Sequence, residues 1–141
     1  MMRRHVILAF FLVIIPPAFP WYAGQGEPDL DAFFLALAEV ESGHDDAAVG
    51  DGGASIGRYQ IQKPYWRDAV EFSDIGGIYT DVKKKAYAER VMRAYWKRYC
   101  PKAYYARDYE TLARIHNGGP KGHKKKATIA YWAKVRRAME K

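Results

Sequence analysis

Cysteine is nearly absent from this chain of 141 residues, which contains one, Cys100. A single cysteine cannot form an intramolecular disulfide, and it lacks the companion ligands of a metal site. The fold must therefore rely on its core, for which 11 Tyr, 4 Trp and 6 Phe supply large apolar surfaces. We expect Cys100 to be structural or incidental, and we expect no metal and no cofactor.

Long apolar runs are also missing, apart from the ten residues 6–15. This run follows a basic N-terminus and precedes a pair of prolines, which is the pattern of a secretory signal peptide. It is too short to span a bilayer comfortably. We predict a signal peptide at residues 1–23, or alternatively an uncleaved anchor, and one domain at residues 24–141 that is secreted or periplasmic.

Acidic residues are outnumbered, because 23 Lys and Arg oppose 16 Asp and Glu. Near the end of the chain, only Glu140 opposes Lys121, Lys124, Lys125, Lys126, Lys134, Arg136, Arg137 and Lys141. Such a basic end could attract a polyanion, such as the anionic polymers of a bacterial wall, or could simply aid solubility. Export argues against nucleic acid as a partner. We expect a monomer without stable membrane association once the signal is cleaved.

The apolar spacing of residues 30–41 predicts an amphipathic helix. Its apolar stripe consists of Leu30, Phe33, Phe34 and Leu37. At about 100° per residue, Glu41 lies in the middle of this stripe and Glu39 lies opposite, toward solvent. Burial raises the pKa of a carboxyl group, which lets it act as a general acid near neutral pH. Because the chain breaks at residues 42–43, we expect Glu41 to face a cleft; a structural carboxyl bonded to backbone amides is the alternative.

A glycine-rich segment follows this helix, and its Asp-Gly-Gly core at 51–53 predicts a tight turn between two short strands. Hydrolysis of a glycosidic bond needs one protonated and one ionised carboxyl group in different environments. We predict Glu41 as the general acid and Asp51 as the nucleophile or stabilising carboxylate. Asp45 and Asp46 are rivals for the second role, and the alternative for Asp51 is a plain turn former.

The remaining pattern is helical. It predicts a short helix from Pro64, a long helix over 81–99, a third from Asp108 to about Asn117, and a last one over 127–139. The expected fold class is therefore α+β and mainly helical, with a small β-hairpin inserted directly after the helix that carries Glu41.

Residues suited to a sugar site lie in three places. These are the second predicted strand, the short helix from Pro64, and the glycine-rich end of the helix predicted from Asp108 to about Asn117. Sugar sites use flat aromatic faces together with amide, hydroxyl or imidazole groups. The predicted substrate-binding set is Ser55, Tyr59, Gln60, Tyr65, Trp66, His116, Asn117 and Gly118. For Tyr65 and Trp66, core packing is the alternative.

Taken together, these segments resemble the invertebrate-type lysozymes, also called the destabilase family. The matching segments are EVESG at 39–43, YQI at 59–61, PYW at 64–66, AY and KRY within 94–99, ARIHNGGPKG at 113–122, and TI, YW and KVR within 128–136. They follow the family's order over about residues 36–137, and the ten-residue run is highly specific. The resemblance implies a lysozyme-like fold and bacteriolytic cleavage of the β-1,4 bond between N-acetylmuramic acid and N-acetylglucosamine. It places the family's catalytic Glu at Glu41 and its catalytic Asp at Asp51.

Two departures from the family carry further expectations. His44, Ile56 and Ala69 stand where cysteines are expected, which predicts lower stability without a change in chemistry and suggests a bacterial relative. The Ser/Lys pair credited with isopeptidase activity in some members falls here on Ala54 and Gln62. Ser55 and Lys63 are each one residue away, and a shift of one residue turns a strand side chain to the opposite face. We therefore predict that isopeptidase activity is absent.

Two other functions compete with a lysozyme. A lytic transglycosylase would use Glu41 alone, with residues 57–60 as its Gly-Gln element, and would give anhydromuramic products without an aspartate. A glycan-binding module without catalysis is the third possibility, although a pure binder gains little from an acid on an apolar face.

Overall fold

The computed structural model describes residues 26–141, so the predicted signal peptide lies outside the described residues. The helices of this part are α1 (Asp31–Ser42), α2 (Lys63–Phe72), α3 (Lys85–Tyr99), α4 (Pro101–Ala106), α5 (Tyr109–Gly118) and α6 (Ile129–Met139). Short 3-10 turns are η2 (Asp51–Gly53), η3 (Tyr79–Lys83), η4 (Gly122–Lys124) and η5 (Lys126–Thr128). Within residues 26–141, no helix combines the length and hydrophobicity needed to cross a membrane.

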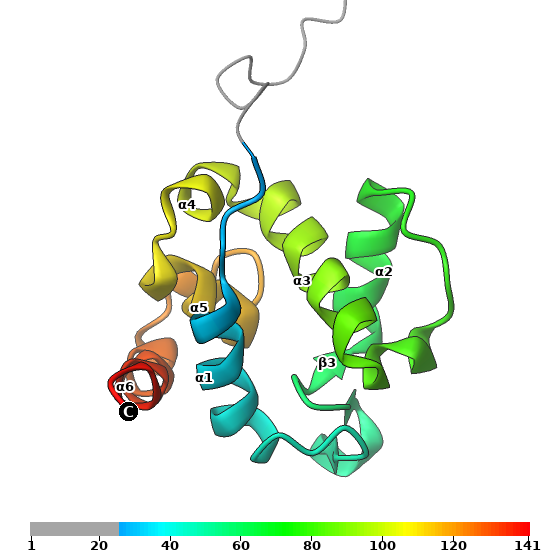
Figure 1. Cartoon of the computed structure of the whole chain (residues 1–141), viewed down its shortest axis with the longest axis horizontal. Coiled ribbons are helices and arrows are strands. Elements are labelled where there is room, and N and C mark those ends of the chain that lie inside the picture. The colour runs from blue at the N-terminus through cyan, green and yellow to red at the C-terminus, as the bar shows by residue number, and fades with distance from the viewer. Residues whose placement is uncertain (1–25) are drawn as a thin grey trace, which may run out of the picture.

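Helix α3 runs through the middle of the molecule, with α2 on one side and α1 and α5 on the other (Figure 1). Helix α6 lies at the outer edge and packs against α1 and α5, while α2 packs against α3. The mainly helical α+β class predicted from the sequence is confirmed.

A small antiparallel sheet follows α1, with β1 (Val49–Gly50), β2 (Ser55–Ile56) and β3 (Ile61–Gln62) in that order. The turn between β1 and β2 is η2, so the predicted hairpin after Glu41 is present. The third strand was not predicted, and it pairs with β2 through Ser55 opposite Gln62. As a result, Tyr59 and Gln60 occupy the turn between β2 and β3 rather than the second strand.

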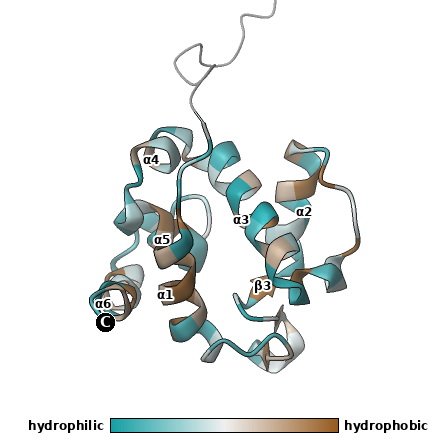
Figure 2. Ribbon diagram, viewed as in Figure 1, coloured by the Kyte–Doolittle hydropathy of each residue, from teal (hydrophilic) through white to brown (hydrophobic). Residues whose placement is uncertain are grey.

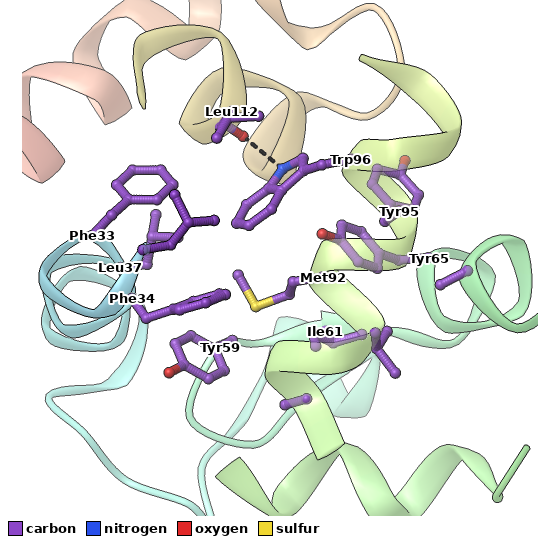
Figure 3. Packing of buried hydrophobic residues seen from close by; sticks show 14 of the residues in the cluster. Phe33, Phe34, Leu37, Tyr59, Ile61, Tyr65, Met92, Tyr95, Trp96 and Leu112 are labelled. Carbon is purple, nitrogen blue, oxygen red and sulfur yellow. Dashed lines mark hydrogen bonds between the residues drawn. The ribbon is translucent and has the colours of Figure 1, made fainter. Parts of the chain in front are cut away.

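The core gathers aromatic side chains from α1 and α3 (Figure 3). The predicted stripe of α1 is buried throughout, with Leu30, Phe33, Phe34 and Leu37 each at most 1% exposed. Figure 2 shows α1 as one of the most hydrophobic helices. Trp96 on α3 is fully buried and donates a hydrogen bond from Nε1 to the Leu112 carbonyl oxygen at 3.1 Å. Full burial of one large apolar side chain contributes roughly 1.5–3 kcal/mol, so this cluster stabilises the fold in the absence of disulfides.

The start of α3 differs from the prediction, and α4 was not predicted. Helix α3 begins at Lys85 rather than Asp81, because the Asp81 carboxylate accepts from the Ile78 amide at 3.0 Å and holds η3 instead. Pro101 ends α3 as predicted but also opens α4, since proline is well suited to the first turn of a helix. The predicted start of α5 is confirmed, because Asp108 caps it by accepting from the Thr111 amide at 3.1 Å.

Candidate active site

A cleft of about 530 Å³ lies where the end of α1 meets the sheet, α2 and α5. Both predicted catalytic carboxylates line it. The lining residues are Glu41, Asp51, Ser55, Gln60, Gln62, Pro64, Tyr65, Asp68, Tyr95, His116, Asn117, Gly119 and Pro120. The chain therefore brings an acid from a helix end and an acid from a glycine turn to one concave surface.

Glu41 lies in the last turn of α1, and its side chain is 16% exposed. Its Oε1 accepts a hydrogen bond from the Tyr131 hydroxyl at 2.6 Å, although Tyr131 lies on α6, 90 residues further along the chain. Burial, reinforced by the charge of Glu41, raises the pKa of Tyr131 well above its usual value. Tyr131 therefore keeps its proton and stays a donor to this carboxyl group. Glu39, by contrast, pairs with Lys141 at the surface.

His116 forms the floor of the site beside Glu41. Its imidazole is 3% exposed, and Nε2 lies 3.5 Å from Glu41 Oε1 and 3.1 Å from the Tyr59 carbonyl oxygen. Because a carbonyl oxygen only accepts, the contacts assign the proton to Nε2. Nδ1 then accepts from the Tyr65 hydroxyl at 3.3 Å, and burial raises the pKa of Tyr65, which keeps that hydroxyl protonated.

Asp51 is held by its own turn. It begins η2 with a positive φ of 50°, it is exposed, and its Oδ2 accepts a hydrogen bond from Ser55 Oγ at 2.6 Å. Ser55 is 1% exposed, so a buried hydroxyl fixes the orientation of an exposed carboxylate. Gly50 leaves room beside it for the Gln60 side chain, because a Cβ at Gly50 would lie 2.1 Å from Gln60 Oε1 and would displace that amide.

The loop after α1 connects the helix that carries Glu41 to the hairpin that carries Asp51, and side-chain contacts hold this loop in place. Ser42 Oγ donates to the Arg58 carbonyl oxygen at 2.8 Å and accepts from the Asp45 amide at 3.0 Å. Asp46 forms an ion pair with Arg58 Nε at 2.7 Å. The Asp45 carboxylate accepts from the Ala47 amide at 2.8 Å, so the carboxylates of both rivals of Asp51 are engaged in this loop, and neither residue lines the cleft.

The predicted substrate-binding residues divide into two groups. Ser55, Gln60, Tyr65, His116 and Asn117 line the cleft, whereas Tyr59, Trp66 and Gly118 do not. Tyr59 is fully buried and donates to Glu89 at 2.6 Å. Trp66 donates from Nε1 to the Tyr87 hydroxyl at 2.9 Å, and the Gly118 carbonyl oxygen accepts from Lys125 at 2.6 Å.

Several residues that line the cleft were not predicted from the sequence. The missed lining residues are Gln62, Pro64, Asp68, Tyr95, Gly119 and Pro120. Asp68 lies one helical turn after Tyr65 on α2, a spacing that predicts a shared face. Tyr95 stacks on Tyr65, with ring centroids 3.6 Å apart. Nothing local to Tyr131 in the sequence points to Glu41, because their contact depends on how α6 packs against α1.

Comparison with known proteins places the whole arrangement in one family. The family model described as Destabilase matches residues 32–138. Lysozyme from Magallana gigas is 38% identical over 85 residues, which are 57% of this chain and 58% of that lysozyme. Lysozyme from Meretrix lusoria is 36% identical over 87 residues, or 61% and 69% of the two chains. Invertebrate-type lysozyme 3 from Caenorhabditis elegans is 34% identical over 92 residues, or 57% and 64%.

Solved structures give the same result for the fold. Inhibitor-bound lysozyme from Meretrix lusoria superimposes with a TM-score of 0.64 at 29% identity, over 80% of this chain and 92% of that one. Tapes japonica lysozyme gives a TM-score of 0.64 at 28% identity, over 79% and 94%. These relatives are bivalves and a nematode, so the predicted bacterial source finds no support. The family match and the shared fold show that this chain belongs to the destabilase family of invertebrate-type lysozymes.

Proposed function

We propose that this protein is a lysozyme that hydrolyses the β-1,4 bond between N-acetylmuramic acid and N-acetylglucosamine in peptidoglycan. The observation that carries this proposal is the pair of carboxylates in one cleft, Glu41 and Asp51, held in different surroundings. Glu41 is mostly enclosed and hydrogen-bonded to the half-buried Tyr131, whereas Asp51 is exposed to solvent. Relatives that carry the name lysozyme support the same reaction. The segment that matches the Magallana gigas lysozyme spans 58% of that protein.

In this mechanism, Glu41 acts as the general acid. Tyr131 occupies Oε1, and within residues 26–141 no hydrogen bond engages Oε2. A proton on Oε2 passes to the glycosidic oxygen as the bond from that oxygen to the anomeric carbon breaks. The same carboxylate then accepts a proton from the incoming water molecule, which restores the acid for the next cycle.

Asp51 supports the positive charge that develops on the sugar, either by electrostatic stabilisation or by direct attack on the anomeric carbon. Its hydrogen bond from Ser55 directs it without neutralising it. Gln60 also lines the cleft, and this position keeps the lytic transglycosylase as the second candidate. In that reaction the 6-hydroxyl of the muramic sugar replaces water, so Glu41 would suffice.

Mass spectrometry of digested peptidoglycan separates these possibilities. Residues 24–141 should release products with reducing muramic ends, and Glu41→Gln should release none. Anhydromuramic products would assign the protein to the transglycosylases. A folded protein that binds glycan strands but releases no product, in both forms, would favour the glycan-binding module.

We propose three further properties on the same basis: export to the cell exterior or periplasm, a monomeric state, and no isopeptidase activity. Ser55 is buried and bonded to Asp51, while Lys63 is exposed at the start of α2, which supports the last of these. Hydrolysis of ε-(γ-glutamyl)-lysine peptides to a free glutamate carboxylate and a free lysine amine would contradict it.

A further inference from the structure

The charge of the described chain is divided between two regions. Residues 121–141 contain eight basic residues and one acidic residue, a formal net charge of +7. Residues 26–120 contain thirteen basic and fifteen acidic residues, a net charge of −2. The positive field of the protein therefore originates in η4, η5 and α6, and the rest of the described domain does not contribute to it.

Most cations of this region are available to a partner. Lys125 donates to a backbone carbonyl, Arg136 lies 3.9 Å from Glu140, and Lys141 pairs with Glu39. The others are exposed and have no acidic partner within residues 26–141. This group, which we call the basic surface, consists of Lys121, Lys124, Lys126, Lys134 and Arg137. No nearby carboxylate compensates the charge of these cations, so they can attract an external anion, and salt screens this attraction.

The packing of α6 orients part of this surface. Lys134 and Arg137 are three residues apart on α6, so they lie on one side of the helix. Val135 is fully buried and Tyr131 contacts Glu41, so the other side of α6 faces the domain. The 3-10 turns that carry Lys124 and Lys126 lead directly into this helix. Figure 1 places α6 at the edge of the molecule, and both Lys134 and Arg137 are exposed there.

We propose that the basic surface binds phosphodiester polymers of the bacterial wall, of the teichoic acid class. Such polymers present one negative charge per repeat along a flexible chain, which matches a series of separate point charges better than a single pocket. On α6, Val135 is buried and Tyr131, Trp132 and Met139 pack against the core, so Ile129 is the one large apolar side chain that the helix exposes. A single exposed isoleucine does not make the apolar face that membrane insertion requires. The choice of a wall polymer over other polyanions rests on the proposed function.

Binding without turnover tests this proposal. The Glu41→Gln protein is sedimented with Gram-positive walls that retain their teichoic acid and with the same walls after its chemical removal. We expect roughly tenfold weaker binding to the stripped walls, and loss of the difference at high salt. Substituting Lys126→Gln, Lys134→Gln and Arg137→Gln together should reduce binding to intact walls to the level of stripped walls.

A matched control removes the same charge elsewhere. Arg67, Lys83 and Lys102 are exposed, have no ion pair within residues 26–141, and lie on α2, η3 and α4. Changing all three to Gln should leave binding to intact walls unchanged, and circular dichroism should show that both triple variants are folded. Equal losses in the two variants would overturn the proposal in favour of net charge alone. Equal binding of the starting protein to both walls would also overturn it, as would stronger binding to anionic lipid vesicles. Because no hydrolysis is measured, a failed lysozyme assay would leave this result intact.

Discussion

Glu41 and Asp51 line the same cleft, but distant parts of the chain hold one and near neighbours hold the other. Glu41 depends on Tyr131 and His116, which lie on α6 and α5. Asp51 depends on Ser55, four residues away in the same hairpin. Tertiary packing therefore positions the proposed acid, Glu41, whereas a local turn positions Asp51. Substitutions in α5 or α6 should affect Glu41, and substitutions in the hairpin should affect Asp51.

Substitution of Glu41, the proposed acid, should cause the largest loss of activity. Glu41→Gln keeps the shape of the side chain but cannot donate a proton to a leaving group, so hydrolysis of peptidoglycan should fall by a factor of about 10³ or more. Glu39→Gln, two residues earlier on the same helix but 38% exposed, is the matched control and should retain activity. A Glu41→Gln protein with substantial turnover would remove the proposed acid from the mechanism.

Substitution of Asp51, the carboxylate held within its own hairpin, should cause the second-largest loss of activity. Asp51→Asn should lower hydrolysis by roughly 10²-fold, since an amide no longer compensates the charge on the sugar. Ser55→Ala leaves the carboxylate but frees its orientation, so the loss should be about tenfold and confined to kcat. Initial rates on purified peptidoglycan glycan strands of defined length give both numbers. Anhydro products from an unimpaired Asp51→Asn protein would instead indicate a transglycosylase.

Loss of the Tyr131 hydroxyl should lower the rate more than it weakens substrate binding. Tyr131→Phe removes the hydrogen bond that holds Glu41 Oε1, and hydrogen bonds to charged groups contribute about 1.5–3 kcal/mol. The carboxyl group is then less well oriented, so kcat should fall about tenfold with KM nearly unchanged. Tyr109→Phe alters an aromatic ring packed on Phe33 and should leave kcat unchanged. An unchanged kcat in Tyr131→Phe would show that this hydroxyl does not position the acid.

The smallest effect on activity is expected at Cys100, outside the cleft. Burial raises the pKa of this thiol to about 12, so at pH 8 almost none of it is thiolate. Iodoacetamide should therefore label the folded protein very slowly and the unfolded protein rapidly, as mass spectrometry would reveal. Cys100→Ala should hydrolyse peptidoglycan at the unaltered rate. Fast labelling of the native protein would contradict the burial of this group.

The same division between local and distant contacts explains what the sequence could predict. The stripe of α1, the cap at Asp108 and the turn at Asp51 depend on periodicity or on neighbours within a few residues, and all three are present. The position of Tyr59 could not be predicted, because its ring fills the core only once β2, β3 and α1 are assembled. Tyr131 was missed as a site residue for the same reason.

One consequence follows from the two sides of α6. Its inner side supplies the hydroxyl that holds Glu41, and its outer side carries Lys134 and Arg137. Loss of α6 after a proteolytic cut before Ile129 would remove the Tyr131 hydroxyl together with Lys134 and Arg137, and would leave Lys121, Lys124 and Lys126 on the domain. One cut would therefore remove the partner of the proposed acid and two of the five cations of the basic surface at the same time.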